Sequence, residues 1–427
     1  MNTQKKNYAL PIAMMFALFF MIAFVTGLQN PMGVIVKNQF GASNFLSQLG
    51  NFANFLAYAF MGIPAGLLLQ KIGYKKTALA AIAIGFIGVA ITFLSGQVEN
   101  FSVYLFGAFI SGFSMCMLNT VVNPLLNGLG KDEKKGNQLL QFGGTLNSLG
   151  ATIVPVLVGY LMGSDEATRT IAKANPALFL AMAIFILAFL VLFFVNIPEP
   201  HIAKEKAAVK DNHSALSFRH FVLGMIAIFI YVGVEVGIMN IGNLYMTSGT
   251  ENGGLGIDPT IAGTVVGTYW FLMLVGRLSG GLIAGKVSSR SMLTVVTSLG
   301  LVFILIGMFS PADTLVNMPV FKSDISIGFA QVPLTIMFFV LTGLCTSVMW
   351  GSIFNLATSG LGKYTATASG LFMTMVVGGG ILPALQGWIA DMSGFVTSYW
   401  LIVAGIAYML FYAIIGSKNV NKNIVVE

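Results

Sequence analysis

Residues 177–195 read ALFLAMAIFILAFLVLFFV, an apolar run that contains no charged residue. A helix needs about 20 residues of this kind to cross a bilayer. The strands of a membrane barrel instead alternate apolar and polar residues in blocks of about ten, and this stretch does not alternate. It therefore predicts a helix that spans a membrane.

Similar runs recur along the whole chain. Of its 427 residues, 56% are hydrophobic and only 9% are charged, so too few charged side chains are present to cover a water-facing surface. We therefore predict an all-α membrane protein with twelve transmembrane helices. The expected spans are residues 8–36, 45–69, 77–95, 101–127, 139–162, 177–196, 219–247, 260–285, 290–310, 331–358, 366–390 and 396–416.

The distribution of positive charge predicts the orientation of these spans. If the N-terminus is cytoplasmic, 17 of the 22 Lys and Arg residues lie on that side; Lys37, Arg169, Lys173 and Lys322 lie opposite, and Arg277 lies within a span. Cytoplasmic loops of membrane proteins carry such an excess. We therefore expect both termini in the cytoplasm, and the basic net charge indicates topology rather than nucleic acid as a partner.

The longest strongly charged segment, NIPEPHIAKEKAAVKDNHSALS at residues 196–217, has six expected spans before it and six after it. The sequence predicts an N-terminal six-helix bundle over residues 1–196, a cytoplasmic linker over 197–218 and a C-terminal six-helix bundle over 219–427.

Internal repeats support this division. NPLLNGLGK at residues 123–131 matches NLATSGLGK at 355–363, and IVPVLVGY at 153–160 matches ILPALQGW at 381–388. The fourth and fifth spans thus correspond to the tenth and eleventh. Two parallel repeats of this kind are typical of transporters in which the halves rock around a central site.

Residues suited to catalysis or metal binding are scarce. Cys116 and Cys345 lie in apolar spans, and His201, His213 and His220 lie in or beside the central loop. No nucleophile motif or phosphate-binding loop is present. We therefore expect no enzyme activity, no cofactor and no metal, and a receptor or membrane enzyme is disfavoured.

One carboxylate lies deep in an expected span. Glu235 is about 24 Å along the seventh span from its cytoplasmic start, at 1.5 Å per residue. A charge at mid-span costs on the order of 2.5 to 3.5 kcal/mol, so such residues are functional candidates by default. We predict that Glu235 binds substrate hydroxyls or a coupling cation; the alternative is an acid that only holds helices together.

Arg277 lies about 12 Å from the cytoplasmic end of the eighth span by the same measure. This depth predicts a gating or structural role for Arg277 and no direct pairing with Glu235. The segment from Gly66 to Lys75, around the loop between the second and third spans, suggests a second gating residue, Lys71. It resembles the facilitator loop motif, with Gln70 in place of the usual acid.

Amides are frequent inside the spans, and amides both donate and accept hydrogen bonds, as hydroxyl-rich solutes require. Hydrogen bonding between helices is the alternative for any single amide. Trp270 and Trp350 also lie within spans, where they either stack on a sugar or fill the core. The predicted substrate-binding residues are Gln29, Asn30, Asn54, Asn119, Asn147, Glu235, Asn240, Trp270 and Trp350.

Short motifs along most of the chain resemble the fucose/glucose/galactose transporter branch of the major facilitator superfamily, and are similar to those of its L-fucose/proton symporters. They are NF at Asn44, IPAG at Ile63, NP at Asn123, LNSLG at Leu146, YVG at Tyr231, GR at Gly276, IF at Ile353 and MTMVVGGG at Met373. The resemblance implies sugar transport by alternating access across the bacterial cytoplasmic (inner) membrane.

The binding positions depart from that branch. Asn30 and Asn119 stand where the resemblance places acids used in proton coupling and sugar recognition, and Gly144 stands in place of a glutamine. A tyrosine-proline pair is replaced by Trp350 and Gly351. Glu235 is then the deep acid that is left for coupling.

The leading hypothesis is a transporter of a monosaccharide or a similar polar solute, driven by a proton or sodium ion. Two alternatives stay open: an uncoupled sugar facilitator, and an efflux pump for amphipathic compounds, which the 12% aromatic content suggests.

Overall fold

The computed structural model describes residues 8–40, 49–162, 171–199, 213–311, 313–322, 324–421 and 423–426. Among these residues, ten helices are long and apolar enough to cross a membrane. The predicted helical membrane architecture is therefore confirmed. Close contacts divide the chain into two compact units: unit 1 comprises Met1–Ala215, Gly360–Thr374 and Val425–Glu427, and unit 2 comprises Leu216–Ser359 and Met375–Ile424.

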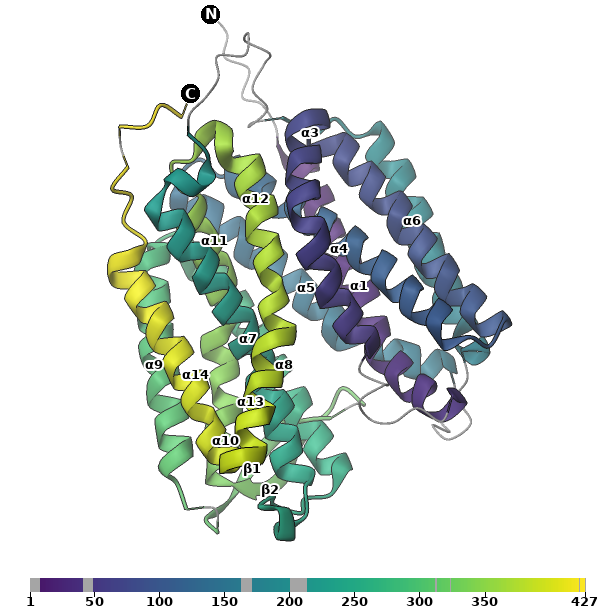
Figure 1. Cartoon of the computed structure of the whole chain (residues 1–427), viewed down its shortest axis with the longest axis vertical. Coiled ribbons are helices and arrows are strands. Elements are labelled where there is room, and N and C mark those ends of the chain that lie inside the picture. The colour runs from purple at the N-terminus through teal and green to yellow at the C-terminus, as the bar shows by residue number, and fades with distance from the viewer. Residues whose placement is uncertain are drawn as a thin grey trace, which may run out of the picture. The chain divides into compact units, whose positions relative to one another are not determined.

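Unit 1 is a bundle of helices (Figure 1). Within it α3 packs against α4 and α6, α1 packs against α5, and α12 packs against α3 and α4. The helices are α1 (Ala9–Phe40), α3 (Leu49–Gln97), α4 (Phe101–Leu129), α5 (Glu133–Met162), α6 (Asn175–Phe194) and α12 (Thr365–Thr374).

Helix α3 joins what the sequence predicts as two separate spans, 45–69 and 77–95. In place of the loop predicted between them, the helix is interrupted at a single residue, Gly73. The φ of Gly73 is 89°, a backbone conformation that suits glycine. The backbone N–H groups of Tyr74 and Lys75 donate to the Glu199 carboxylate at 2.7 and 3.2 Å. This carboxylate caps the restarted helix, so that no loop is needed.

Unit 2 is a second helical bundle, and it carries a small sheet. Helix α7 packs against α13, α11 and α14, while α10 packs against α9 and α8. The elements are α7 (Arg219–Thr247), α8 (Pro259–Ala284), α9 (Ser289–Phe309), β1 (Leu315–Phe321), β2 (Ile327–Pro333), α10 (Leu334–Thr346), α11 (Met349–Thr358), α13 (Gly378–Ser393) and α14 (Phe395–Phe411).

Two predicted spans are interrupted. The span at 331–358 begins in strand β2 and breaks between α10 and α11 at Ser347 and Val348. The span at 366–390 changes to a 3-10 turn over Met375–Val377 between α12 and α13. Helix α13 then starts at Gly378, where a Cβ atom would overlap the carbonyl oxygen of Phe229 in α7. Glycine at this position lets α13 touch the backbone of α7.

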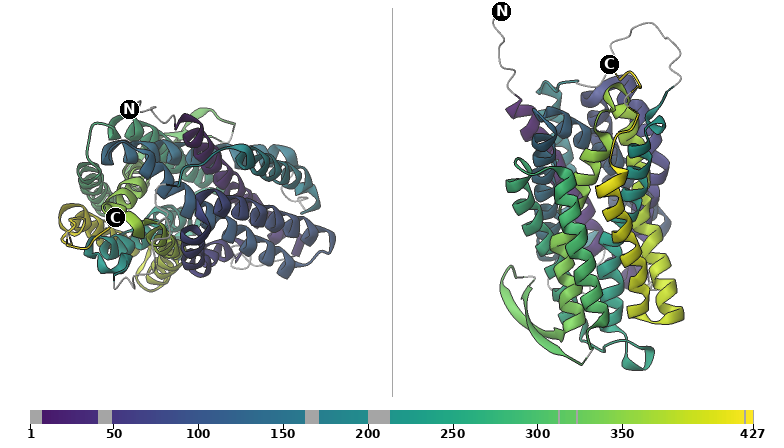
Figure 2. Two further views of the ribbon diagram at one scale, coloured as in Figure 1. Left: turned by 90° about the horizontal axis from the view of Figure 1, so that it is seen from above. Right: turned by 90° about the vertical axis from the view of Figure 1, so that its left-hand side faces the viewer.

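The all-helical prediction missed the antiparallel hairpin of β1 and β2, in which Leu315 pairs with Pro333 and Phe321 with Ile327. The hairpin lies where α9 ends and α10 begins, and Figure 2 shows it as a curved pair of light-green strands. Alternating burial in β1, with Met318 and Val320 buried, explains why the strand forms.

Candidate functional site

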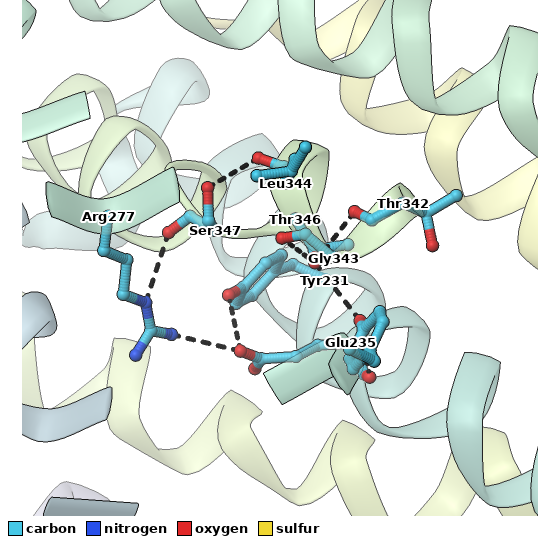
Figure 3. A network of polar contacts seen from close by, with 9 residues as sticks. Tyr231, Glu235, Arg277, Thr342, Gly343, Leu344, Thr346 and Ser347 are labelled. Carbon is cyan, nitrogen blue, oxygen red and sulfur yellow. Dashed lines mark hydrogen bonds and ion pairs between the residues drawn. The ribbon is translucent and has the colours of Figure 1, made fainter. Parts of the chain in front are cut away.

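A buried ion pair lies inside unit 2. Nη2 of Arg277, from α8, is 3.1 Å from Oε1 of Glu235, from α7, and the two side chains are only 12% and 13% exposed (Figure 3). The prediction that depth would keep these residues apart is wrong. It counted residues along two helices as though both ended at one level, and it neglected the length of the arginine side chain.

Two tyrosines hold Glu235 in place. The hydroxyl of Tyr231, one turn earlier in α7, donates to Oε1 of Glu235 at 2.9 Å. The hydroxyl of Tyr269, from α8, donates to the backbone carbonyl of Glu235 at 3.0 Å and is hydrogen-bonded to Oγ1 of Thr346 at 3.2 Å. Neither tyrosine was predicted from the sequence. Tyr231 could have been, because its spacing of four residues from Glu235 places the two side chains on one face of α7.

The two oxygens of the Glu235 carboxylate therefore differ. Oε1 accepts from both Arg277 and Tyr231, whereas within the described residues Oε2 accepts no hydrogen bond. A carboxylate has lone pairs for several donors. Oε2 is thus free to accept a proton or a solute hydroxyl while Oε1 stays held.

The break between α10 and α11 contributes to this network. The backbone carbonyl of Ser347 accepts from Nε of Arg277 at 3.2 Å, and the Ser347 hydroxyl donates to the carbonyl of Leu344 (Figure 3). Carbonyls near the end of a helix lack partners within the helix. The interruption therefore supplies an acceptor for Arg277, and two of the nitrogens of its guanidinium group are fixed in direction.

Both predicted tryptophans lie beside this network. The Trp350 ring centroid is 6.2 Å from that of Tyr231, and the Trp270 ring centroid is 5.2 Å from that of Tyr269. Each tryptophan is only partly buried. The structure thus places both rings next to a tyrosine that contacts Glu235.

Asn119, one of the predicted amides, lies in a polar cluster in unit 1. Nδ2 of Asn119, in α4, donates to the hydroxyl of Tyr58, in α3, at 2.9 Å, and Nδ2 of Asn123 lies 3.3 Å from Oδ1 of Asn119. Asn54, one turn before Tyr58, is buried, and within the described part of the chain its Oδ1 has no hydrogen-bond partner. Tyr58 was not predicted.

The remaining predicted amides are dispersed. Nδ2 of Asn147 donates to the carbonyl of Phe19 at 3.2 Å, which joins α5 to α1. Asn240 is exposed, and no described hydrogen bond joins it to Glu235. Gln29 and Asn30 lie in α1, but their side chains are outside the described part of the structure.

One buried amide in unit 2 is unusual. Gln386, in α13, is fully buried, and neither atom of its amide has a partner among the described residues. It faces α7, because a Cβ atom at Gly237 would lie 2.6 Å from Oε1 of Gln386. A buried amide without partners costs stability.

The predicted gating residue Lys71 is exposed at the turn in α3. Two residues near Lys71 in the sequence make hydrogen bonds to other helices. Oε1 of Gln70 accepts from the hydroxyl of Thr367 in α12 at 3.2 Å, and Nζ of Lys75 donates to the carbonyl of Phe193 in α6 at 2.7 Å. Gln70, which replaces an acid in the loop motif, thus still links α3 to α12.

No group of three or more His, Cys, Asp or Glu residues that could hold a metal ion occurs in the ranges that the structure describes. The polar groups that converge are an acid, a guanidinium group, hydroxyls and amides. Such groups bind polar solutes and protons.

Ionisable residues inside membrane-spanning helices pair with one another and mark functional sites, including substrate and ion pathways. The chain belongs to the Major Facilitator Superfamily, whose family model matches residues 15–382. It is therefore a multi-pass membrane transporter rather than an enzyme.

Curated relatives match nearly the whole chain. It is 29% identical to the glucose/galactose transporter of Brucella abortus (biovar 1, strain 9-941), with 98% of this chain and 97% of the relative covered. A putative glucose/galactose transporter of Helicobacter pylori (strain 26695) is also 29% identical, over 97% of this chain and 99% of the relative. The L-fucose-proton symporter of Escherichia coli K12 is 23% identical over 94% of this chain and 91% of the relative.

Solved structures agree on the fold. The crystal structure of the transporter FucP in the outward conformation matches with a TM-score of 0.81 at 20% identity, over 96% of this chain and all of that one. The proton:xylose symporter XylE bound to 6-bromo-6-deoxy-D-glucose matches with a TM-score of 0.68 at 16% identity, over 94% of this chain and 93% of that one.

Proposed function

We propose that this transporter moves a monosaccharide across the bacterial cytoplasmic membrane by alternating access, coupled to a cation, with a proton favoured over sodium. Relatives named as glucose/galactose transporters and as L-fucose-proton symporters support the sugar and the proton. The proposal includes twelve spans in two six-helix halves, with a linker at 197–218 and both termini in the cytoplasm.

The single observation that carries the coupling proposal is the state of Glu235. Its Oε1 is held by Arg277 and Tyr231, while Oε2 accepts no described hydrogen bond. A proton that binds this carboxylate removes the charge that attracts Arg277. Proton binding and a rearrangement of Arg277 are therefore linked, and Arg277 is then free to donate to a solute hydroxyl.

The solute is held by groups that match hydroxyls. Trp350 and Trp270 provide flat apolar surfaces beside Tyr231 and Tyr269, on which the apolar face of a sugar ring can stack. In unit 1, Asn54 and Asn119 provide amide groups near Tyr58. Gln29, Asn30, Asn147 and Asn240 complete the proposed set of binding residues, and Lys71 and Arg277 are the proposed gating residues.

An uncoupled facilitator is the second candidate, and one observation favours it. Asn30 and Asn119 cannot ionise, although the resemblance places proton-coupling acids at their positions. On this alternative the Glu235–Arg277 pair is purely structural.

Transport assays in proteoliposomes test the proposal. A panel of labelled hexoses, amino sugars and fucose is offered with an imposed proton gradient, with a sodium gradient and with neither. We expect at least one hexose to accumulate only under the proton gradient. Exchange of a hexose without accumulation under any gradient would favour the facilitator, and failure of every sugar would contradict the proposed substrate class.

A further inference from the structure

The break between α10 and α11 is small. Ser347 keeps helical dihedral angles, with a φ of −52° and a ψ of −43°, whereas Val348 has a φ of −98° and a ψ of −2°. An α-helix has a φ near −63° and a ψ near −42°, so Val348 departs from it by about 35° in φ and about 40° in ψ. Modest rotations at this one residue would therefore join α10 and α11 into a continuous helix.

An arginine occupies the acceptor that a continuous helix would use. In an α-helix the carbonyl of Ser347 would accept from the N–H of Gly351, four residues later. In this structure the Ser347 carbonyl accepts from Nε of Arg277 at 3.2 Å, and among the described residues no backbone N–H donates to it (Figure 3). A side chain that inserts into the backbone hydrogen bonds of a helix is a common cause of kinks. Arg277 therefore stabilises the broken form of this span.

The span is held in place on both sides of the break. In α10, Oγ1 of Thr346 is hydrogen-bonded to the hydroxyl of Tyr269 at 3.2 Å, and the same hydroxyl donates to the backbone carbonyl of Glu235. In α11, Oδ1 of Asn355 accepts from the hydroxyl of Ser289 at 2.8 Å. Residues 347–354 therefore lie between two fixed points, and a change at the break is confined to them.

Trp350 lies in this segment, two residues after Val348. Its ring centroid is 6.2 Å from that of Tyr231, whose hydroxyl donates to Oε1 of Glu235. Rotations at Val348 change the direction in which the following residues leave the break. A change in the break would therefore move the Trp350 ring relative to Tyr231 and Glu235.

We propose that the charge of Glu235 determines whether α10 and α11 are joined. While Glu235 is ionised, it holds Arg277 beside the Ser347 carbonyl, and the span stays broken. A proton or another cation that binds Glu235 removes this attraction. Arg277 then leaves the carbonyl, the N–H of Gly351 takes its place, and closure of the helix turns Trp350.

This inference rests on the proposed function, because it takes Glu235 as the cation site and Trp350 as a contact of the solute. It explains how a cation at Glu235 could change the binding of a solute beside Trp350. Tyr269 is a positioning residue in this scheme, since it holds α10 against the backbone of Glu235 while Arg277 moves. Closure depends on the charge of Glu235 alone, so it is measurable without a solute or a gradient.

Fluorine NMR in lipid nanodiscs tests the proposal. The full chain is labelled with fluorotryptophan, and the signals of its 4 tryptophans are assigned by replacing each with phenylalanine. Trp350 is the reporter, and the exposed Trp388 and Trp400 are references. The wild type and Glu235→Gln are compared, each with and without Gly351→Pro. Proline has no N–H, and its ring clashes with the carbonyl four residues earlier, so the helix cannot close in the Gly351→Pro background.

We expect Glu235→Gln to move the larger part of the Trp350 signal to a new resonance when residue 351 is glycine. When residue 351 is proline, Glu235→Gln should leave the Trp350 signal in place, and the two references should not change in either background. Equal shifts in both backgrounds would show that the lost charge acts on Trp350 without closure. That result, or no shift with glycine at residue 351, would overturn the proposal.

Gly351→Ala keeps the test valid if the proline variant fails to fold. Alanine favours a helix more than glycine does, so with Glu235 intact the Trp350 signal should move toward its position in Glu235→Gln. A signal that stays at the wild-type position would overturn the proposal. Failure of the proposed function has a different result: a protein that shows these shifts but accumulates no sugar under any gradient would contradict the coupling and still support the closure.

Discussion

The guanidinium group of Arg277 lies 3.1 Å from the carboxylate of Glu235, with both side chains almost enclosed by unit 2. Removal of one member of a buried ion pair leaves an uncompensated charge, which costs about 3 to 5 kcal/mol. We therefore expect Arg277→Gln to lower the free energy of unfolding by an amount of this order.

The double variant Glu235→Gln/Arg277→Gln checks that explanation. It removes both charges, so we expect it to be more stable than Arg277→Gln alone in thermal unfolding followed by intrinsic fluorescence. Equal or greater loss of stability in the double variant would show that the two charges are not coupled.

Tyr231→Phe removes one of the two donors to Oε1 of Glu235 and leaves the ring in place. A hydrogen bond to a charged group contributes about 1.5 to 3 kcal/mol, which corresponds to roughly a 10- to 100-fold change in an equilibrium constant. We expect concentrative uptake to fall by at least about tenfold.

Tyr399→Phe is the matched control, because its buried hydroxyl donates to the carbonyl of Ile238 and not to the carboxylate. This variant should lose stability but keep its coupling. Equal losses of uptake in the two variants, measured in the same proteoliposomes, would argue that Tyr231 acts only through folding.

Gln386→Met replaces a buried amide without described partners by an apolar side chain of similar length. An unsatisfied buried polar group costs about 1 to 3 kcal/mol, so we expect the free energy of unfolding to rise by up to this amount. Asn355→Leu is the contrast, because the Asn355 side chain accepts from the Ser289 hydroxyl at 2.8 Å and its loss should destabilise. Loss of transport or of stability in Gln386→Met would instead indicate that the amide binds a solute, an ion or water.

The hydrogen bonds at the start of α8 should make the stability of the protein depend on pH. Hydrogen bonds from the side chain and the backbone of Thr260 hold the pKa of Asp258 below its usual range. The unfolded chain lacks these bonds, so their stabilisation is complete above the ordinary aspartate pKa of about 3.9, and it is lost as the pH falls through the lowered value. Asp258→Ala should therefore lower the melting temperature at neutral pH, and the difference from the wild type should shrink in acid. If the difference in melting temperature between Asp258→Ala and the wild type is the same at neutral and at acid pH, the carboxylate of Asp258 does not stabilise α8 in this way.

Much of the fold could be predicted from the sequence, because apolar runs long enough to cross a bilayer seldom form anything other than membrane-spanning helices. The errors have local causes. Gly73 alone turns the chain within α3, so a break of one residue was predicted as a loop. The hairpin was missed because LVNMPVF at 315–321 has one polar residue and therefore no apolar–polar alternation; its side chains alternate only in burial, which the structure shows.

The candidate site could be predicted only in part. Glu235 could be identified because a carboxylate inside a membrane span is energetically costly and is therefore a functional candidate. Arg277 was also singled out, but its contact with Glu235 was not predicted, because that contact depends on how α7 and α8 lie against one another, which spacing along one helix does not determine. Tyr231 and Tyr58 each lie one turn from a predicted residue, so a search at a spacing of four residues would have found them.

The central claim is that Glu235 couples solute movement to a cation. Uptake of the transported sugar into proteoliposomes under an imposed proton gradient, compared between the wild type and Glu235→Gln, tests it most directly. We predict that the wild type accumulates the sugar, and that Glu235→Gln exchanges it across the membrane without accumulating it. Undiminished accumulation by Glu235→Gln would contradict the account.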